Sequence, residues 1–116
     1  MDMENILNLL RQYEFHDLCV DKISFIDNDT KVELSIIILP FNEEKDDYDK
    51  VEVYFSDIIN LKTTELHFTK NSCIEINSFD YKWSEIFIGK FIFTQGFGES
   101  CFLLEIECGK VEITEK

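Results

Sequence analysis

The sequence contains little of what marks linkers, low-complexity tails and long helices. Among its 116 residues there are one proline and four glycines, and alanine is absent. Flexible linkers and disordered tails are rich in glycine, serine and proline, so this composition argues against such segments. Alanine is the strongest helix former, whereas the eleven phenylalanines suit strands. We therefore expect a single domain spanning residues 1–116, built mainly of β structure.

Histidine is also scarce, and this weakens most enzyme hypotheses. The two histidines, His16 and His67, lack a second histidine at the spacing of a zinc site. A GxSxG nucleophile motif is missing, and Gly96-Phe97-Gly98 lacks the third glycine of a dinucleotide-binding loop. We expect no metal, no cofactor and no catalytic activity. The enzyme alternative is a small hydrolase that uses His16, Asp17 and a cysteine, although these two residues are more simply interpreted as a helix-to-strand corner.

Basic residues are outnumbered by acidic ones. Eleven lysines and arginines stand against 24 aspartates and glutamates, which gives a formal net charge of −13. Such a field opposes nucleic acids and anionic membrane surfaces, because both are bound through lysine and arginine. It attracts a basic protein and accelerates the encounter with it. The alternative interpretation is that the acidity only keeps the domain soluble.

Long apolar runs and secretion signals are missing as well. No stretch of the sequence approaches the roughly 20 apolar residues of a membrane-spanning helix. Asp2 and Glu4 stand where a secretory segment carries lysine or arginine. The four cysteines contain no CxxC pair, and without a secretion signal they are expected to be reduced thiols. The sequence therefore predicts a cytoplasmic protein that does not bind membranes.

Hydrophobic periodicity predicts one helix followed by about seven or eight antiparallel strands. Apolar residues recur at helical spacing over residues 3–13, and alternation typical of strands follows. A slip at Asp21-Lys22 predicts a bulge, Pro40 should end a strand, and Gly109-Lys110 should form a turn. We expect a curled sheet or a sandwich whose open edge is covered by the N-terminal helix. Residues 57–72 give no clear pattern.

The loop NEEKDDYD at residues 42–49 is the most suggestive local feature. It joins two strand patterns and carries five acids, one lysine and one tyrosine. It lacks the central glycine of a calcium-binding loop, so we expect no calcium there. An exposed tyrosine among carboxylates suits an interface anchor, and the alternative is a hairpin tip kept soluble by its charge. The candidate partner-binding residues are Glu43, Glu44, Asp46, Asp47, Tyr48 and Asp49.

A second aromatic group lies in YKWSEIF. Tyr81, Trp83 and Phe87 are residue types found at interface hot spots, but they are equally suited to a core. Trp83 is therefore a secondary candidate for partner binding, together with His16 and Asp17.

Three segments together resemble a group of small bacterial β-rich proteins. YEFHDLCVDKISF is similar to their Y-x-F-H-D-x-x-V opening, KVEVYFSDIINL to a V-x-V-x-F-x-D-V segment, and FLLEIECGKVEI to their closing pattern. The group includes members similar to immunity proteins of polymorphic-toxin systems. This resemblance implies a β-rich fold and binding to a toxin. It implies no catalytic role for His16 or Asp17.

Charge and resemblance together favour a non-enzymatic binding module of the immunity type, which neutralises a basic toxin. A different hypothesis is a structural or adaptor protein that self-associates through a sheet edge or an aromatic patch around Trp83. The sequence leaves the partner and the oligomeric state open.

Overall fold

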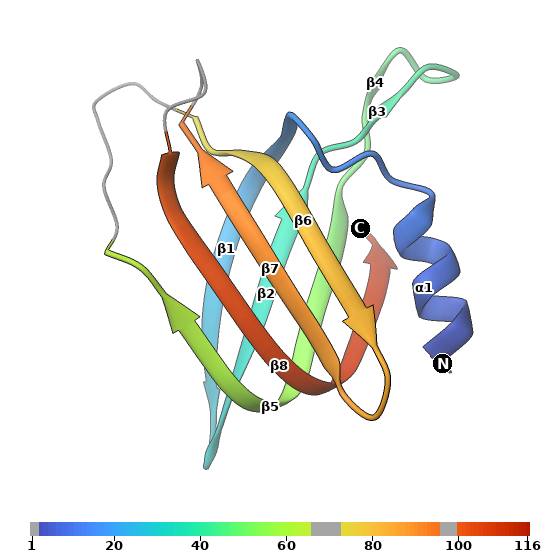
Figure 1. Ribbon diagram of the computed structural model, residues 1–116. Helices are drawn as coiled ribbons and strands as arrows, with labels where there is room; N and C mark the ends of the chain where they lie inside the picture. Colours follow the sequence, from blue (N-terminus) through green and yellow to red (C-terminus); the bar gives the residue numbers. More distant parts are fainter. Residues whose placement is uncertain (1–2, 66–72, 96–99) are drawn as a thin grey trace.

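The computed structural model describes residues 3–65, 73–95 and 100–116, and these ranges contain one helix and eight strands (Figure 1). The elements are α1 (Met3–Arg11), β1 (Leu18–Asn28), β2 (Lys31–Ile38), β3 (Phe41–Asn42), β4 (Asp47–Tyr48), β5 (Val51–Thr63), β6 (Glu75–Trp83), β7 (Phe87–Thr94) and β8 (Ser100–Glu115). The predicted mainly β fold with one N-terminal helix is confirmed. The predicted turn at residues 96–98 lies outside the described residues.

Six strands form one antiparallel sheet that closes on itself. Their order is β1-β2-β5-β8-β7-β6, and the barrel closes because β6 also pairs with β1. The closing contact is short, since it joins only Leu18 to Ile76 and Cys19 to Glu75. β3 and β4 form a separate two-stranded sheet. One continuous sheet whose two halves face each other across a shared core fits the curled-sheet form of the prediction best (Figure 1).

The two longest strands, β5 and β8, bend and belong to both halves of the sheet (Figure 1). In β5 a register shift falls between Ile58 and Asn60, just after Asp57, whose φ of 51° is in the left-handed region. Gly109 of β8 lies against this irregularity, because a Cβ atom there would be 3.3 Å from the Cβ of Asp57. The predicted turn at Gly109-Lys110 is therefore wrong. The strand continues through the glycine, which leaves room for the bend instead of ending the element.

Local signals nearer the N-terminus are confirmed. The register between β1 and β2 shifts between Val20 and Lys22, where the sequence predicted a bulge. β2 ends at Ile38, two residues before Pro40, which has no backbone N–H to donate. β2 then pairs with β5 in antiparallel fashion across the acidic loop, as expected for a hairpin with a long tip.

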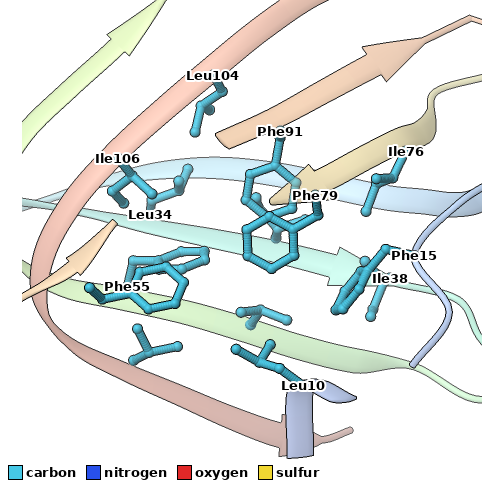
Figure 2. Close-up of a cluster of buried hydrophobic side chains, with 14 of the residues drawn as sticks. Leu10, Phe15, Leu34, Ile38, Phe55, Ile76, Phe79, Phe91, Leu104 and Ile106 are labelled. Carbon is cyan, nitrogen blue, oxygen red and sulfur yellow. The ribbon is translucent and has the colours of Figure 1, made fainter. Parts of the chain in front are cut away.

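The core is apolar and rich in phenylalanine (Figure 2). Alternate residues of β2 and β7 point inward, and Phe79 of β6 stacks on Phe91 with ring centroids 3.9 Å apart. Burying one such side chain contributes roughly 1.5–3 kcal/mol to stability. The largest fully buried side chains are Phe55, Phe87, Phe91, Phe93, Ile6, Leu10, Leu34, Ile36, Ile38, Ile76, Leu104 and Ile106.

The helix α1 packs beside the end of β8 that β7 does not reach. Ile6 and Leu10 lie on one face of the helix, and both are completely buried in the core. α1 packs against β8, and Figure 1 shows it beside the C-terminal part of that strand. β7 begins opposite Cys108, so the last residues of β8 have no β7 partner in the described ranges. The helix occupies this side of the strand.

Candidate functional site

The acidic loop is an ordered hairpin that projects from one end of the barrel (Figure 1). We call residues 41–49 the acidic hairpin. Its two short strands pair Phe41 with Tyr48 and Asn42 with Asp47. At its base the N–H of Asp49 donates to the carbonyl of Pro40 at 2.9 Å. The turn is completed by Asp46, whose φ of 54° lies in the left-handed region that aspartate tolerates better than most residues.

Asn42 holds this hairpin together from within. Its side-chain oxygen accepts hydrogen bonds from the backbone N–H groups of Glu44 and Lys45, at 3.0 and 3.4 Å. Its side-chain nitrogen donates to Asp49 Oδ2 at 3.0 Å. Lys45 Nζ reaches the other oxygen of the same carboxylate at 2.9 Å. One asparagine and one aspartate therefore fix both ends of the turn.

Asp49 differs from the other four acids of the hairpin. Hydrogen bonds from Lys45 and then from Asn42 lower the pKa of its carboxyl. Its charge is largely neutralised by Lys45, so it serves the hairpin itself. Glu43, Glu44, Asp46 and Asp47 are exposed, and within the described ranges none of them forms an ion pair. The sequence pattern grouped all five acids, but Asp49 is held in an ion pair and, within the part of the chain that the structure describes, the other four are not.

Tyr48 has an aromatic partner that the sequence analysis missed. The rings of Phe41 and Tyr48 meet edge to face, with centroids 5.2 Å apart and an angle of 72° between the ring planes. Both remain largely exposed, Phe41 by 51% and Tyr48 by 57%, and neither belongs to the core. The signal was present, because the two residues flank the turn symmetrically in FNEEKDDY.

Negative charge continues beyond the hairpin. Tyr13, in the loop after α1, has a pKa raised first by burial and then by the nearby carboxylates of Glu115 and Asp49. Lys50, which follows the hairpin, is engaged by Asp21 of β1 with an Nζ–Oδ2 distance of 3.4 Å. The cations Lys45 and Lys50 at this end of the barrel are thus both held by aspartates.

His16 and Asp17 form a corner that ties the chain to β6. The Nδ1–H of His16 donates to the carbonyl of Asn77 at 2.7 Å, and the N–H of Asp17 donates to the carbonyl of Ile76, also at 2.7 Å. His16 Nε2 lies 3.4 Å from Asp17 Oδ2. The hydrogen bond to Asn77, followed by the charge of Asp17, raises the pKa of His16. These contacts reinforce the short seam between β1 and β6.

Trp83 packs inward rather than standing on the surface. It pairs with Phe87 across the β6–β7 hairpin, and their rings meet edge to face with centroids 5.6 Å apart. Phe87 is fully buried, while Tyr81 and Trp83 are half-buried against the core. This arrangement follows the core interpretation of the YKWSEIF segment.

The described residues offer little that could activate a nucleophile. They contain no group of three histidine, cysteine or acidic side chains that could hold a metal ion. Burial raises the pKa of Cys19, and it raises the pKa of Cys108 to about 11, so both thiols resist ionisation at neutral pH. No helix in the described ranges has the length and apolar character needed to cross a membrane.

A cleft with a volume of about 280 Å³ lies beside β1. Apolar side chains of Val20, Ile23, Phe25 and Ile74 contribute to its lining, and its two charged residues, Asp21 and Lys22, have opposite signs. Asp21 is already paired with Lys50. The cleft therefore lacks converging polar groups of the kind that orient a substrate.

Comparisons with protein-family models, curated proteins and solved structures gave no match to the chain.

Proposed function

We propose that this protein is a non-enzymatic inhibitor of the immunity type, which binds a basic toxin domain through its acidic hairpin. The observation that carries the proposal is the hairpin itself. It holds four exposed carboxylates without basic partners in the described ranges, next to an exposed pair of aromatic rings. Interfaces typically combine aromatic anchors, which become buried on binding, with a polar rim, and this hairpin carries exposed aromatic and acidic residues of both kinds.

The charge supports a cationic partner. The whole chain carries a net charge of −13, and a field of this sign raises the association rate of a basic protein by long-range attraction. A nuclease is one such partner, because its active site must be basic to bind phosphate groups. The carboxylates on the narrow projecting hairpin carry the same negative charge as the phosphate groups of a nucleic-acid substrate. Occupation of the active site by the hairpin would then block substrate approach.

The hairpin is also prepared for binding. The hydrogen bonds of Asn42 and Asp49 fix its turn before any partner arrives. A preorganised loop loses less conformational entropy on association, so more of the contact energy contributes to affinity.

Two variants that remove the same number of charges test the proposal. Both are compared with the wild type in cells that produce a toxin domain encoded beside this protein, and in stopped-flow association with that domain. The hairpin variant carries Glu43→Gln, Glu44→Gln, Asp46→Asn and Asp47→Asn. The control variant carries Asp27→Asn, Asp29→Asn, Glu65→Gln and Glu85→Gln, which replace exposed acids outside the hairpin.

We expect the hairpin variant to associate at least about fivefold more slowly and to protect cells poorly, while the control variant stays close to wild type. The difference should shrink in 1 M salt, where the Debye length falls to about 3 Å. Equal effects of the two variants would mean that only total charge matters. The proposal is wrong if the wild type neither binds nor protects against the toxin.

Self-association is the second candidate, and the edge of β1 favours it. β1 pairs with β6 only at Leu18 and Cys19, so residues 21–28 have no strand on that side within the described ranges. Phe25 on the same strand is 55% exposed. Free strand edges and exposed apolar residues promote pairing with another chain. Light scattering distinguishes the candidates, because a stable homodimer that is lost in a Phe25→Lys variant would favour self-association. The half-buried position of Trp83 gives less support to a dimer built on that residue.

A further inference from the structure

The two rings of the acidic hairpin lie on one face of a small sheet. Phe41 and Tyr48 are directly opposite each other in the β3–β4 register, so both side chains project from the same side. Asn42 and Asp47 form the neighbouring pair and project from the other side, where Asn42 makes its bonds to the turn and to Asp49. One face of the hairpin thus stabilises the turn, and the opposite face carries two exposed rings.

These rings do not contribute to the core, and their arrangement leaves them accessible. In an edge-to-face pair the edge of one ring covers only one face of the other, so more ring surface stays accessible than in a parallel stack. The stacked pairs in the core, such as Phe91 with Phe93, are instead buried. Exposure of two aromatic side chains to water is unfavourable unless another protein covers them, so their position is more easily understood as a contact surface for a partner protein.

The negative charge of the hairpin indicates which kind of side chain would bind at the rings. Glu43, Glu44 and Asp46 are exposed in the turn that joins the two ring-bearing strands, while Asp47 adds negative charge from the opposite face. The one lysine of the turn is held by Asp49 at 2.9 Å. The face of an aromatic ring is itself negative and attracts cations. A cation is therefore favoured twice at this position, by the carboxylates and by the rings.

Between the two protein cations, arginine fits this surface better than lysine. The guanidinium group is planar, is weakly hydrated and stacks on aromatic faces, while its N–H groups still reach carboxylates at the ring edge. The ammonium group of lysine is a compact and strongly hydrated charge, and it gains less from an exposed ring.

We propose that the Phe41–Tyr48 face of the acidic hairpin is a recognition platform for an arginine side chain of the partner protein, with the guanidinium group stacked on the rings and bonded to the adjacent carboxylates. This assignment rests on the proposed function, since it identifies the partner side chain that the hairpin contacts. It also explains why an aromatic pair accompanies the acids, which charge attraction alone does not require.

A peptide titration tests the platform without the natural partner. The probes are a short glycine-spaced arginine peptide and a lysine peptide of the same length and charge, each added to the full chain and followed by NMR. We expect the arginine peptide to shift the ring resonances of Phe41 and Tyr48 and to bind about two- to fivefold more tightly than the lysine peptide.

Ring substitutions then separate stacking from charge. Phe41→Leu and Tyr48→Leu keep an apolar side chain and all the acids, and each should lower the affinity for the arginine peptide about two- to fivefold and reduce the preference over lysine. Phe25→Leu is the matched control, because Phe25 is equally exposed but lies on β1. It should leave both affinities unchanged.

The outcomes also separate this inference from the proposed function. Equal affinity for the two peptides, or wild-type arginine binding by both ring variants, overturns the arginine platform. Suppose that the arginine platform is overturned, but the variant without the four acids binds the peptides more weakly than the wild type. The acidic hairpin is then still the binding surface, and the proposed function stands. If that variant also binds like the wild type, both proposals fail.

Discussion

Gly89 of β7 lies against three core side chains, and replacing it with alanine should destabilise the fold. A Cβ atom at this position would lie 2.9 Å from Cε1 of Phe87, 3.1 Å from Cε1 of Phe79 and 3.3 Å from Cγ2 of Ile106. Carbon atoms in contact are normally about 3.5–4.0 Å apart. The new methyl group therefore overlaps with two rings at once.

Neither ring can move away easily. Phe79 is stacked on Phe91 with ring centroids 3.9 Å apart, and Phe87 is packed against Phe55 and Trp83. Overpacking of this kind typically costs 1–3 kcal/mol, roughly. Alanine recovers about 0.5–1 kcal/mol, because glycine loses more conformational freedom on folding. The net expectation is a loss of up to about 2.5 kcal/mol, centred near 1 kcal/mol, with a fall in Tm of about 4 °C for each kcal/mol.

Urea unfolding followed by Trp83 fluorescence measures this effect, since the indole ring lies 5.6 Å from the ring of Phe87. Gly109→Ala is the matched control. A Cβ there would have one tight neighbour, the Cβ of Asp57 at 3.3 Å, and the position is exposed, so the loss of stability should be smaller than for Gly89→Ala. If Gly89→Ala is as stable as Gly109→Ala, the ring cluster has spare room, and the packing argument is refuted.

Three further outcomes are expected. Asn42→Ala should loosen the acidic hairpin, which amide exchange at residues 43–48 would detect as lost protection while the barrel stays intact. Cys73 is exposed, whereas Cys108 is buried and its pKa is about 11, so a thiol reagent at pH 8 should modify Cys73 quickly and Cys108 only after unfolding. A hydrogen bond to Glu33 raises the pKa of Tyr54 to about 12. The folded state is therefore favoured below pH 10 and loses this contribution as the pH rises towards 12. Absorbance at alkaline pH should show a late-ionising phenol that ionises earlier in a Glu33→Gln variant, and a variant that leaves the titration unchanged would contradict the assignment.

Much of the fold could be predicted because its signals are local. The helical spacing of Ile6 and Leu10, the slip at Asp21-Lys22 and the strand end before Pro40 each depend on a few neighbouring residues. Longer-range features were missed. Gly109 was predicted to form a turn because its role depends on Asp57, more than fifty residues away, and β5 continues through Asp57 only because a left-handed residue and a bulge accommodate it.

The candidate site shows the same division. The acids and Tyr48 could be predicted to lie together, because they are adjacent in the sequence. The pairing of Phe41 with Tyr48 depends on the register of two very short strands, which periodicity does not determine. The separate role of Asp49 could not be predicted either, because it follows from hydrogen bonds to Asn42 and Lys45.

The short seam between β1 and β6 has a consequence for how the protein folds and opens. Closure joins Leu18 to Ile76 across more than fifty residues of chain, through two residue pairs, whereas β1 and β2 are neighbours joined by a tight turn. Distant contacts of this kind are costly in loop entropy, so the seam should close after the β1–β2 and β6–β7 hairpins have formed. The barrel should also open first at this seam, by separation of β1 from β6. The corner at His16 and Asp17 makes two hydrogen bonds to β6, and these bonds help to keep the barrel closed.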